Sequence, residues 1–172
     1  MATPSEIACL RLALIPGLGP ITYLNLVQRF GSSEGILAAP RGDVAQFAGA
    51  AVAQALASGP DPHLVERSLA WMDLPGHHLL TAENTAYPEM LRQIPDPPIA
   101  LYAIGRIELL QRPCVAIVGS RNCTPQGARD ARTLARDLSK AGLCIASGLA
   151  LGIDAAAHRG GLEEGASSIA VM

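Results

Sequence analysis

Aromatic and charged side chains are scarce in this chain. They make up 3% and 16% of its 172 residues, whereas 49% of the residues are hydrophobic. This composition excludes an intrinsically disordered protein and predicts a core built from Leu, Ile, Val and Ala. No uncharged apolar run approaches the roughly 18 residues of a transmembrane helix, so no membrane contact is expected. The first residues carry no basic charge and no small-residue cleavage site, so we expect no secretory signal.

The sequence also lacks the short motifs that hold metals and nucleotide cofactors. Its four cysteines form no CxxC pair, and its four histidines supply no ligands at short spacing. Neither the GxGxxG fingerprint of dinucleotide-binding proteins nor the GxxxxGK[ST] Walker sequence is present. We therefore expect no metal and no cofactor, and free thiols typical of a reducing cytoplasm.

Positive charge is sparse overall, and its distribution along the chain is uneven. The formal net charge of -2 excludes a polycation that holds nucleic acid by bulk charge. Residues 1–86 contain four arginines against seven acidic residues, whereas residues 106–159 contain eight basic residues against four acidic ones. Any local basic patch is therefore expected in the second half of the chain.

Residues 1–82 are predicted to form a small helical domain. Apolar residues recur near helical spacing over 6–14, 21–30, 43–56 and 64–72. The turn Pro-Gly-Leu-Gly-Pro-Ile over 16–21 resembles the hairpin of helix-hairpin-helix modules, which offer backbone amides to a DNA phosphate. No Lys or Arg lies next to this turn, so a structural or protein-docking role is at least as well supported as DNA binding.

Residues 83–172 are predicted to form a parallel-sheet α/β domain. Strands are indicated by continuous apolar runs over 99–103, 114–118, 143–147 and 168–171. The run over 114–118 is expected to be buried on both faces of the sheet. Helices are expected from Thr124 to Gly142 and from about Asp154 to Gly165, which gives a βαβαβ order. Since three parallel strands seldom make a finished domain, we expect the N-terminal portion of a longer protein.

The first candidate site follows the strand over 114–118. Gly119, Ser120 and Arg121 stand at the carboxyl end of this strand, where ligands bind in open α/β sheets. A glycine lets backbone approach a phosphate, a serine donates a hydrogen bond, and an arginine contacts phosphate oxygen atoms bidentately. An ordinary strand-to-helix turn with a solvent-facing arginine explains these residues equally well.

The second candidate loop follows the next strand and is expected to face the same crevice. Its residues are small and include Ser147, Gly148, Ala150 and Gly152. Two such loops side by side make a notch of phosphate size with amides pointing inward.

Asp154 and His158 lie four residues apart on one face of the following helix. They are candidates for an acid–base pair. We favour a structural interpretation, with Asp154 as a helix cap and His158 as a hydrogen-bond donor, because no nucleophile is evident.

One helix carries a stripe of basic residues. On the helix after Thr124 they project from one side as Arg129, Arg132, Arg136 and Lys140. The stripe is either a track for a nucleic-acid backbone or the solvated face of an amphipathic helix, and we favour the solvated face.

Together these motifs resemble the bacterial DNA-processing protein A family (DprA, also called Smf). The resemblance covers about 85 residues and is carried by Tyr87-Pro88, Asp96-Pro97-Pro98, Leu101-Tyr102, Val115-Ala116-Ile117-Val118-Gly119-Ser120-Arg121, Ser147-Gly148, Ala150, Gly152-Ile153-Asp154 and Ala157-His158. The Ser-Gly-x-Ala-x-Gly-Ile-Asp-x-x-Ala-His string is its most specific part. The helical segment is similar to the SAM-like domain of the family, though less distinctively.

The resemblance implies a fold and a function. The expected fold is a small all-helical SAM-like (helix-hairpin-helix) domain followed by an incomplete Rossmann-like domain. The implied function is non-enzymatic: a cytoplasmic protein that binds single-stranded DNA, protects incoming DNA during natural transformation and helps to load the RecA recombinase. Gly119, Ser120 and Arg121 would hold phosphates, and the loop from Ser147 to Gly152 would line the pocket. The implied homodimer surface lies beyond Met172.

An enzymatic alternative stays open at this point. The same Rossmann-like superfamily includes nucleotide hydrolases such as cytokinin-releasing phosphoribohydrolases. These enzymes use a Pro-Gly-Gly-x-Gly-Thr-x-x-Glu motif, which this sequence does not contain.

Overall fold

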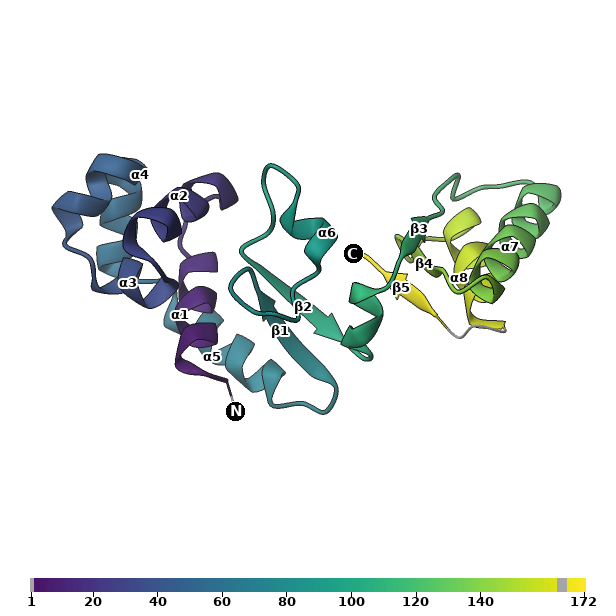
Figure 1. Ribbon diagram of the computed structural model, residues 1–172, viewed down its shortest axis with the longest axis horizontal. Coiled ribbons are helices and arrows are strands. Elements are labelled where there is room, and N and C mark those ends of the chain that lie inside the picture. Colours follow the sequence, from purple (N-terminus) through teal and green to yellow (C-terminus); the bar gives the residue numbers. More distant parts are fainter. Residues whose placement is uncertain (1, 164–166) are drawn as a thin grey trace. The chain divides into compact units, whose positions relative to one another are not determined.

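The computed structural model describes residues 2–163 and 167–172. The chain forms two compact units, Met1–Ile107 and Glu108–Met172, whose elements are drawn in Figure 1. Each unit has its own cluster of buried apolar residues. The division into domains over 1–82 and 83–172 stays a prediction. Within the described ranges, no helix has both the length and the apolar character needed to span a membrane.

Short helices occupy the beginning of the first unit, as the sequence predicts. They are α1 (Pro4–Ala13), α2 (Pro20–Phe30), α3 (Ser33–Ala38), α4 (Arg41–Ser58) and α5 (Pro62–Met72). Local sequence explains where they begin and end. Thr3 and Glu6 form a reciprocal capping box at the start of α1, and Gly31, at a φ of 86°, ends α2.

The glycine-rich turn between α1 and α2 is anchored in the apolar core of the first unit. Ile15 and Leu18 are 3% and 6% exposed and belong to that core. The Leu18 N–H donates to the Ile15 carbonyl at 3.2 Å, and Gly17 adopts a φ of 82° that favours glycine. These contacts give the turn a structural role, which is one of the two interpretations that the sequence leaves open.

The first unit also contains a pair of antiparallel strands, of which the sequence indicates only the second. These strands are β1 (His77–Thr81) and β2 (Ala100–Ile104). β1 is short and begins with two histidines, so its sequence shows no clear alternation of apolar and polar residues that would predict a strand. The Trp71 ring of α5 lies 4.5 Å from the His77 ring and 5.1 Å from the Tyr102 ring, measured between centroids. Edge-to-face ring contacts therefore attach α5 to both strands.

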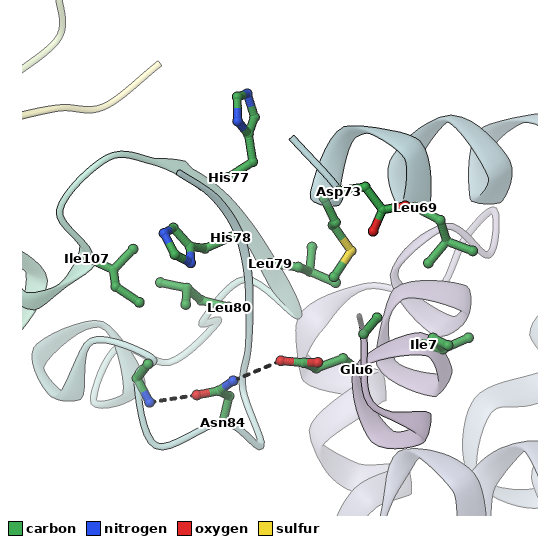
Figure 2. A pocket seen from close by; sticks show the side chains of 13 residues that line it. Glu6, Ile7, Leu69, Asp73, His77, His78, Leu79, Leu80, Asn84 and Ile107 are labelled. Atoms are coloured by element: carbon green, nitrogen blue, oxygen red, sulfur yellow. Dashed lines mark hydrogen bonds between the residues drawn. The ribbon is translucent and has the colours of Figure 1, made fainter. Parts of the chain in front are cut away.

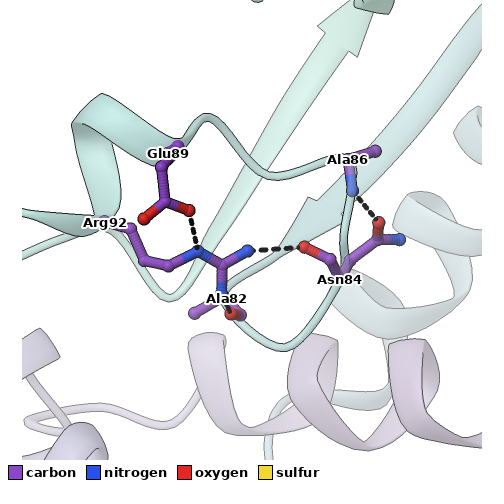
Figure 3. A network of polar contacts seen from close by, with 5 residues as sticks. All are labelled: Ala82, Asn84, Ala86, Glu89 and Arg92. Carbon is purple, nitrogen blue, oxygen red and sulfur yellow. Dashed lines mark hydrogen bonds and ion pairs between the residues drawn. The ribbon is translucent and has the colours of Figure 1, made fainter. Parts of the chain in front are cut away.

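Arg92 restrains the connection between these two strands (Figure 3). It is the last residue of α6 (Glu89–Arg92). Its guanidinium donates to the carbonyl oxygen atoms of Ala82 and Asn84, the latter at 2.7 Å, and pairs with the Glu89 carboxylate at 3.5 Å. Charge-assisted hydrogen bonds to two carbonyls hold the backbone of a segment with little regular structure.

A second contact in the same connection involves residues that carry the family resemblance. Tyr87 is 1% exposed, and its hydroxyl donates to the Pro98 carbonyl at 2.8 Å. This hydrogen bond joins the two ends of the proline-rich segment. The contacts of Tyr87 and Pro98 are therefore structural.

A hydrogen-bond network in the first unit joins the helices to the segment after β1. The Tyr23 hydroxyl donates to Glu83 Oε1 at 3.1 Å, and the Ser33 N–H donates to the same oxygen at 2.8 Å. Cys9 Sγ lies 3.5 Å from the Tyr23 hydroxyl. Burial raises the pKa of the Cys9 thiol and of the Tyr23 hydroxyl above their usual values.

The described residues of the second unit form a parallel sheet of order β3-β4-β5, which confirms the predicted fold class. After the 3-10 helix η1 (Ile107–Gln111), its elements are β3 (Cys114–Ala116), α7 (Pro125–Lys140), β4 (Cys144–Ser147), α8 (Ile153–Glu163) and β5 (Ser168–Ala170). The core contains Ala135, Ile145 and Ala157, each 0% exposed. Gly165, which the sequence predicts as the end of the last helix, lies outside the described residues.

A cap and glycines set the beginning and end of α7 and its close approach to α8. The Thr124 hydroxyl caps α7 by accepting the Gly127 N–H at 3.1 Å, and Gly142, at a φ of 94°, follows its end. A Cβ on Gly160 of α8 would lie 2.1 Å from the Arg132 carbonyl oxygen of α7. Only glycine therefore permits this close helix contact.

The expectation that the run over 114–118 is buried on both faces is wrong for this structure. β3 ends at Ala116, its exposure alternates from residue to residue, and Val118 is 72% exposed. In the described sheet β3 is an edge strand whose one neighbour is β4. A continuous apolar run does not by itself reveal whether a strand has neighbours on both sides.

The free energy of unfolding is expected to decrease above about pH 9, because two buried thiols and a buried phenol ionise more easily in the unfolded chain than in the folded protein. Burial, followed by the neighbouring Cys114 thiol, raises the pKa of Cys144 to about 11, and the pKa values of Cys9 and Tyr23 are raised as well. The unfolded chain releases these protons first, near the usual cysteine value of 9.0, so the free energy of unfolding decreases as the pH rises from there. Urea unfolding at about pH 8 and about pH 10.5 measures the decrease. A Cys144→Ala variant should show a shallower decrease, and an equally steep one would contradict this assignment.

Candidate functional site

The first predicted loop rests directly on the start of α8. A Cβ on Gly119 would lie 2.8 Å from Cγ1 of Ile153, so only glycine allows the backbone to lie against this side chain. Ser120 Oγ accepts the Asn122 N–H at 3.1 Å, which shapes the turn that follows. The structure therefore places Gly119 and Ser120 at the edge of the sheet, in contact with the helix that follows β4.

The second predicted loop meets the first through backbone atoms. Gly152 has a φ of 79°, and a Cβ there would lie 2.2 Å from the Ser120 carbonyl oxygen and 2.6 Å from that of Arg121. The next residue, Ile153, donates its N–H to the Ser120 carbonyl at 3.2 Å. The structure thus brings the two predicted loops into contact, as expected for the carboxyl ends of neighbouring parallel strands.

Asp154 organises the second loop. It is 6% exposed, and its Oδ2 accepts the N–H groups of Gly148 at 3.2 Å and Ala150 at 3.4 Å. The carboxylate therefore holds the preceding loop, and it accepts no N–H group of α8 among the described residues, so the predicted role of Asp154 as a helix cap is wrong. The expectation that the loop amides point into the notch is wrong for Gly148 and Ala150, because their N–H groups donate to this carboxylate.

Ser147 has a similar positioning role. It is 4% exposed, and its hydroxyl donates to the Ile117 carbonyl at 2.7 Å. This bond joins the end of β4 to the residue that leads into the first loop. Ser147 therefore links the two strands from which the loops emerge, and its hydroxyl proton is already engaged in a hydrogen bond.

His158 is held by β5 and has separate partners from Asp154. The Ser168 hydroxyl donates to the Ile145 carbonyl at 3.0 Å, so its oxygen accepts from His158 Nδ1 at 2.7 Å. His158 Nε2 is buried and has no hydrogen-bond partner among the described residues. An acid–base pair of Asp154 and His158 is therefore absent from the contacts described, and His158 donates a structural hydrogen bond.

Arg121 is the exposed cation beside the joined loops. Its guanidinium makes no hydrogen bond or ion pair with any residue that the structure describes. The arginine stripe on α7 differs, because Arg132 pairs with Glu163 and Arg136 pairs with Asp137 at 3.1 Å. Partial neutralisation favours the interpretation of that stripe as a solvated helix face, whereas the charge of Arg121 is not neutralised by any described residue.

The sequence analysis missed three residues that contact the predicted site residues and hold them in place. Ile153 supports Gly119 and bonds to Ser120, Ile117 accepts from Ser147, and Ser168 holds His158. Ile153 had a usable signal, since it stands inside the glycine-isoleucine-aspartate string. The roles of Ile117 and Ser168 depend on strand pairing and have no signature in the sequence.

A separate pocket lies within the first unit (Figure 2). It has a volume of about 540 Å³ and is lined by residues of α1, α5 and β1, including Glu6, Met72 and His78, and by Asp73, which follows α5. Glu6 accepts from the Asn84 side chain at 3.3 Å, so part of its polar lining is internally satisfied. The described residues include no group of three or more His, Cys, Asp and Glu placed to hold a metal ion.

The second unit belongs to a recognisable class: α/β proteins of Rossmann type, with small-residue loops at the carboxyl ends of adjacent parallel strands. The family model described as DNA recombination-mediator protein A matches residues 78–172, and the chain belongs to this family. The match includes both site loops, Asp154 and His158.

Known relatives are similar over different parts of the chain. Protein Smf of Escherichia coli (strain K12) is 40% identical over 108 residues, which cover 63% of this chain and 29% of that protein. Protein Smf of Synechocystis sp. is 32% identical over 183 residues, which cover 100% of this chain and 45% of that protein. The chain therefore spans less than half the length of these relatives.

A solved structure is similar over almost the whole chain. The X-ray structure of DNA processing protein A (DprA) from Streptococcus pneumoniae aligns with a TM-score of 0.74 and 32% sequence identity. The alignment covers 99% of this chain and 57% of that one. The fold described above is thus a DprA fold.

Proposed function

We propose that this chain binds single-stranded DNA at the joined loops and acts as a recombination mediator without catalysing a reaction. The observation that supports this most is the backbone contact of Gly152 with Ser120 and Arg121, which joins the second loop to a residue whose exposed guanidinium is unpaired among the described residues. A guanidinium is suited to bidentate contact with phosphate oxygen atoms. Membership of the recombination-mediator family supports DNA as the source of that phosphate.

The remaining predicted residues shape the notch in this proposal. Gly119 and Ser120 approach the phosphate together with Arg121. Four further residues line or support the second loop, namely Ser147, Gly148, Ala150 and Gly152. Asp154 fixes that loop through two amide hydrogen bonds, and His158 holds α8 against β5.

The contacts of the titratable residues support a binding role over a catalytic one. Asp154 is 6% exposed and accepts two backbone N–H groups, and the unbonded Nε2 of His158 is buried. A general base needs an acceptor within reach of the proton that it abstracts, and burial keeps both groups from a ligand in solvent. No contact described at the joined loops favours the alternative of a nucleotide hydrolase.

The partners of the family belong to the same proposal. Loading of the RecA recombinase and dimerisation are implied by the resemblance, and this chain spans less than half of the two Smf proteins compared above. Light scattering tests dimerisation, and a pull-down with purified RecA tests that interaction.

An Arg121→Gln variant is expected to bind single-stranded DNA about tenfold more weakly than the unchanged chain. The loss of one charge-assisted phosphate contact costs about 1.5 kcal/mol, which corresponds to roughly a factor of ten. Fluorescence anisotropy with a labelled oligothymidine and a matching duplex, at two salt concentrations, measures the affinities. The slope of log affinity against log salt should decrease in magnitude by about 0.7 in the variant.

The matched control is Arg136→Gln on α7, which removes the same charge from a residue paired with Asp137. It should change the affinity less than twofold. Failure of the unchanged chain to bind single strands at low salt would overturn the proposal for this chain. A larger effect of Arg136→Gln than of Arg121→Gln would move the binding site to the α7 stripe.

A further inference from the structure

The second site loop presents two large apolar side chains to solvent. Leu149 is 56% exposed and Leu151 is 76% exposed. They alternate with the small residues Gly148, Ala150 and Gly152. Burial of apolar surface is the dominant favourable contribution to folding, so two neighbouring leucines left in water call for a reason other than packing.

The backbone at Leu149 is held in a conformation that leucine disfavours. Its φ is 56°, and it is the one residue other than glycine with a positive φ in the described part of the chain. The loop is fixed on either side, because Asp154 accepts the N–H groups of Gly148 and Ala150 and Gly152 lies against the first loop. A glycine at position 149 would adopt this φ without strain. Packing in the core therefore does not explain why a strained backbone position carries leucine, because more than half of this side chain is exposed.

The positive charge of Arg121, in the adjoining loop, indicates the chemistry of a ligand that would contact these leucines. The carbonyl oxygen of Arg121 lies against Gly152, and the Arg121 guanidinium is exposed and unpaired among the described residues. A ligand that contacts both the guanidinium and the leucines needs a phosphate group close to an apolar face. Each nucleotide of a single strand provides this combination, whereas paired bases in a duplex bury their faces by stacking.

We propose that Leu149 and Leu151 form an apolar platform for the bases of single-stranded DNA whose phosphates contact Arg121. This inference rests on the proposed function and assigns the contact surface within it. Single-strand binding proteins commonly use aromatic rings for this contact. The second unit contains no Phe, Trp or Tyr, and the exposed apolar side chains of its second site loop are Leu149 and Leu151.

The test compares DNA with and without bases. A labelled oligothymidine and an abasic phosphodiester strand of equal length are titrated with the unchanged chain, with Arg121→Gln and with a double variant, Leu149→Gly with Leu151→Gln. The unchanged chain should prefer oligothymidine about tenfold, and the double variant should reduce this preference to less than threefold. Its salt dependence should stay unchanged, because an apolar contact releases no counterions. Arg121→Gln should bind both strands more weakly and keep the preference.

The matched control replaces exposed leucines elsewhere in the second unit. Leu134→Gln with Leu162→Gln alters side chains that are 53% and 55% exposed on α7 and α8, and it should leave the preference intact. Leu149→Gly relieves backbone strain, so the double variant should melt within a few degrees of the unchanged chain. If the double variant nevertheless unfolds, Leu151→Gln alone should reduce the preference at least twofold, and no reduction would overturn the inference.

The possible results separate the inference from the proposed function. If the unchanged chain binds neither strand, the proposed function fails. If it binds both strands equally well, or if the leucine variants keep its preference for bases, DNA binding stands and the leucine platform is overturned.

Discussion

A Gly152→Ala variant is expected to lose about 2–4 kcal/mol of unfolding free energy and about tenfold in affinity for single-stranded DNA. Alanine at a φ of 79° is strained, and its Cβ would lie 2.2 Å from the Ser120 carbonyl oxygen. Backbone atoms cannot rotate aside as a flexible side chain does, so the two loops must separate. Separation breaks the hydrogen bond from Ile153 to Ser120 and displaces Arg121. Urea unfolding and anisotropy with labelled oligothymidine measure the two losses.

Gly142→Ala is the matched control for this change. Gly142 has a φ of 94°, but nothing lies within 4 Å of a Cβ built there. This variant therefore carries the conformational cost without the clash and should lose about 1 kcal/mol of stability, with DNA affinity unchanged. Equal effects of the two variants would show that the contact between the loops contributes nothing.

A Gly160→Ala variant is expected to destabilise the second unit by about 2 kcal/mol or more. In the middle of a helix, alanine usually stabilises relative to glycine by about 1 kcal/mol. Here its Cβ would lie 2.1 Å from the Arg132 carbonyl oxygen and 2.9 Å from Cβ of Ala135, so α7 and α8 must move apart. Thermal unfolding followed by circular dichroism near 222 nm measures the effect.

Gly127→Ala tests the same substitution on α7 where there is room. The nearest atom to a Cβ at this position is Thr124 Oγ1, at 3.4 Å, an ordinary contact distance. We expect a change between zero and about 1 kcal/mol in the stabilising direction. Destabilisation similar to that of Gly160→Ala would contradict the close-crossing explanation.

Local signals in the sequence predict most of the fold of the second unit. Thr124 and Gly142 mark the beginning and end of α7, and the apolar runs mark all three strands of the described sheet. The exposure of Val118 was not predictable, because it depends on which strands neighbour β3. β1 was also not predictable, because it is defined by hydrogen bonds to β2 about twenty residues later.

The candidate site was predictable in position but not in its hydrogen bonding. Adjacent parallel strands necessarily bring the loops at Gly119 and Gly152 to one edge of the sheet. Which groups the Asp154 carboxylate accepts depends on its side-chain conformation inside the fold, and no spacing rule specifies it. The hydrogen bond between His158 and Ser168 of β5 was not predictable for the same reason, because it depends on side-chain conformations inside the fold.

The ring cluster around Trp71 makes the two units spectroscopically distinct. The one Trp, three Tyr and two Phe residues of the chain all lie within residues 1–107. Tryptophan fluorescence therefore reports the packing of α5 against β1 and β2, and residues 108–172 contribute no tryptophan signal. Circular dichroism follows the helices of both units. In one urea titration, the difference between the two signals isolates the unfolding of the unit that carries Arg121.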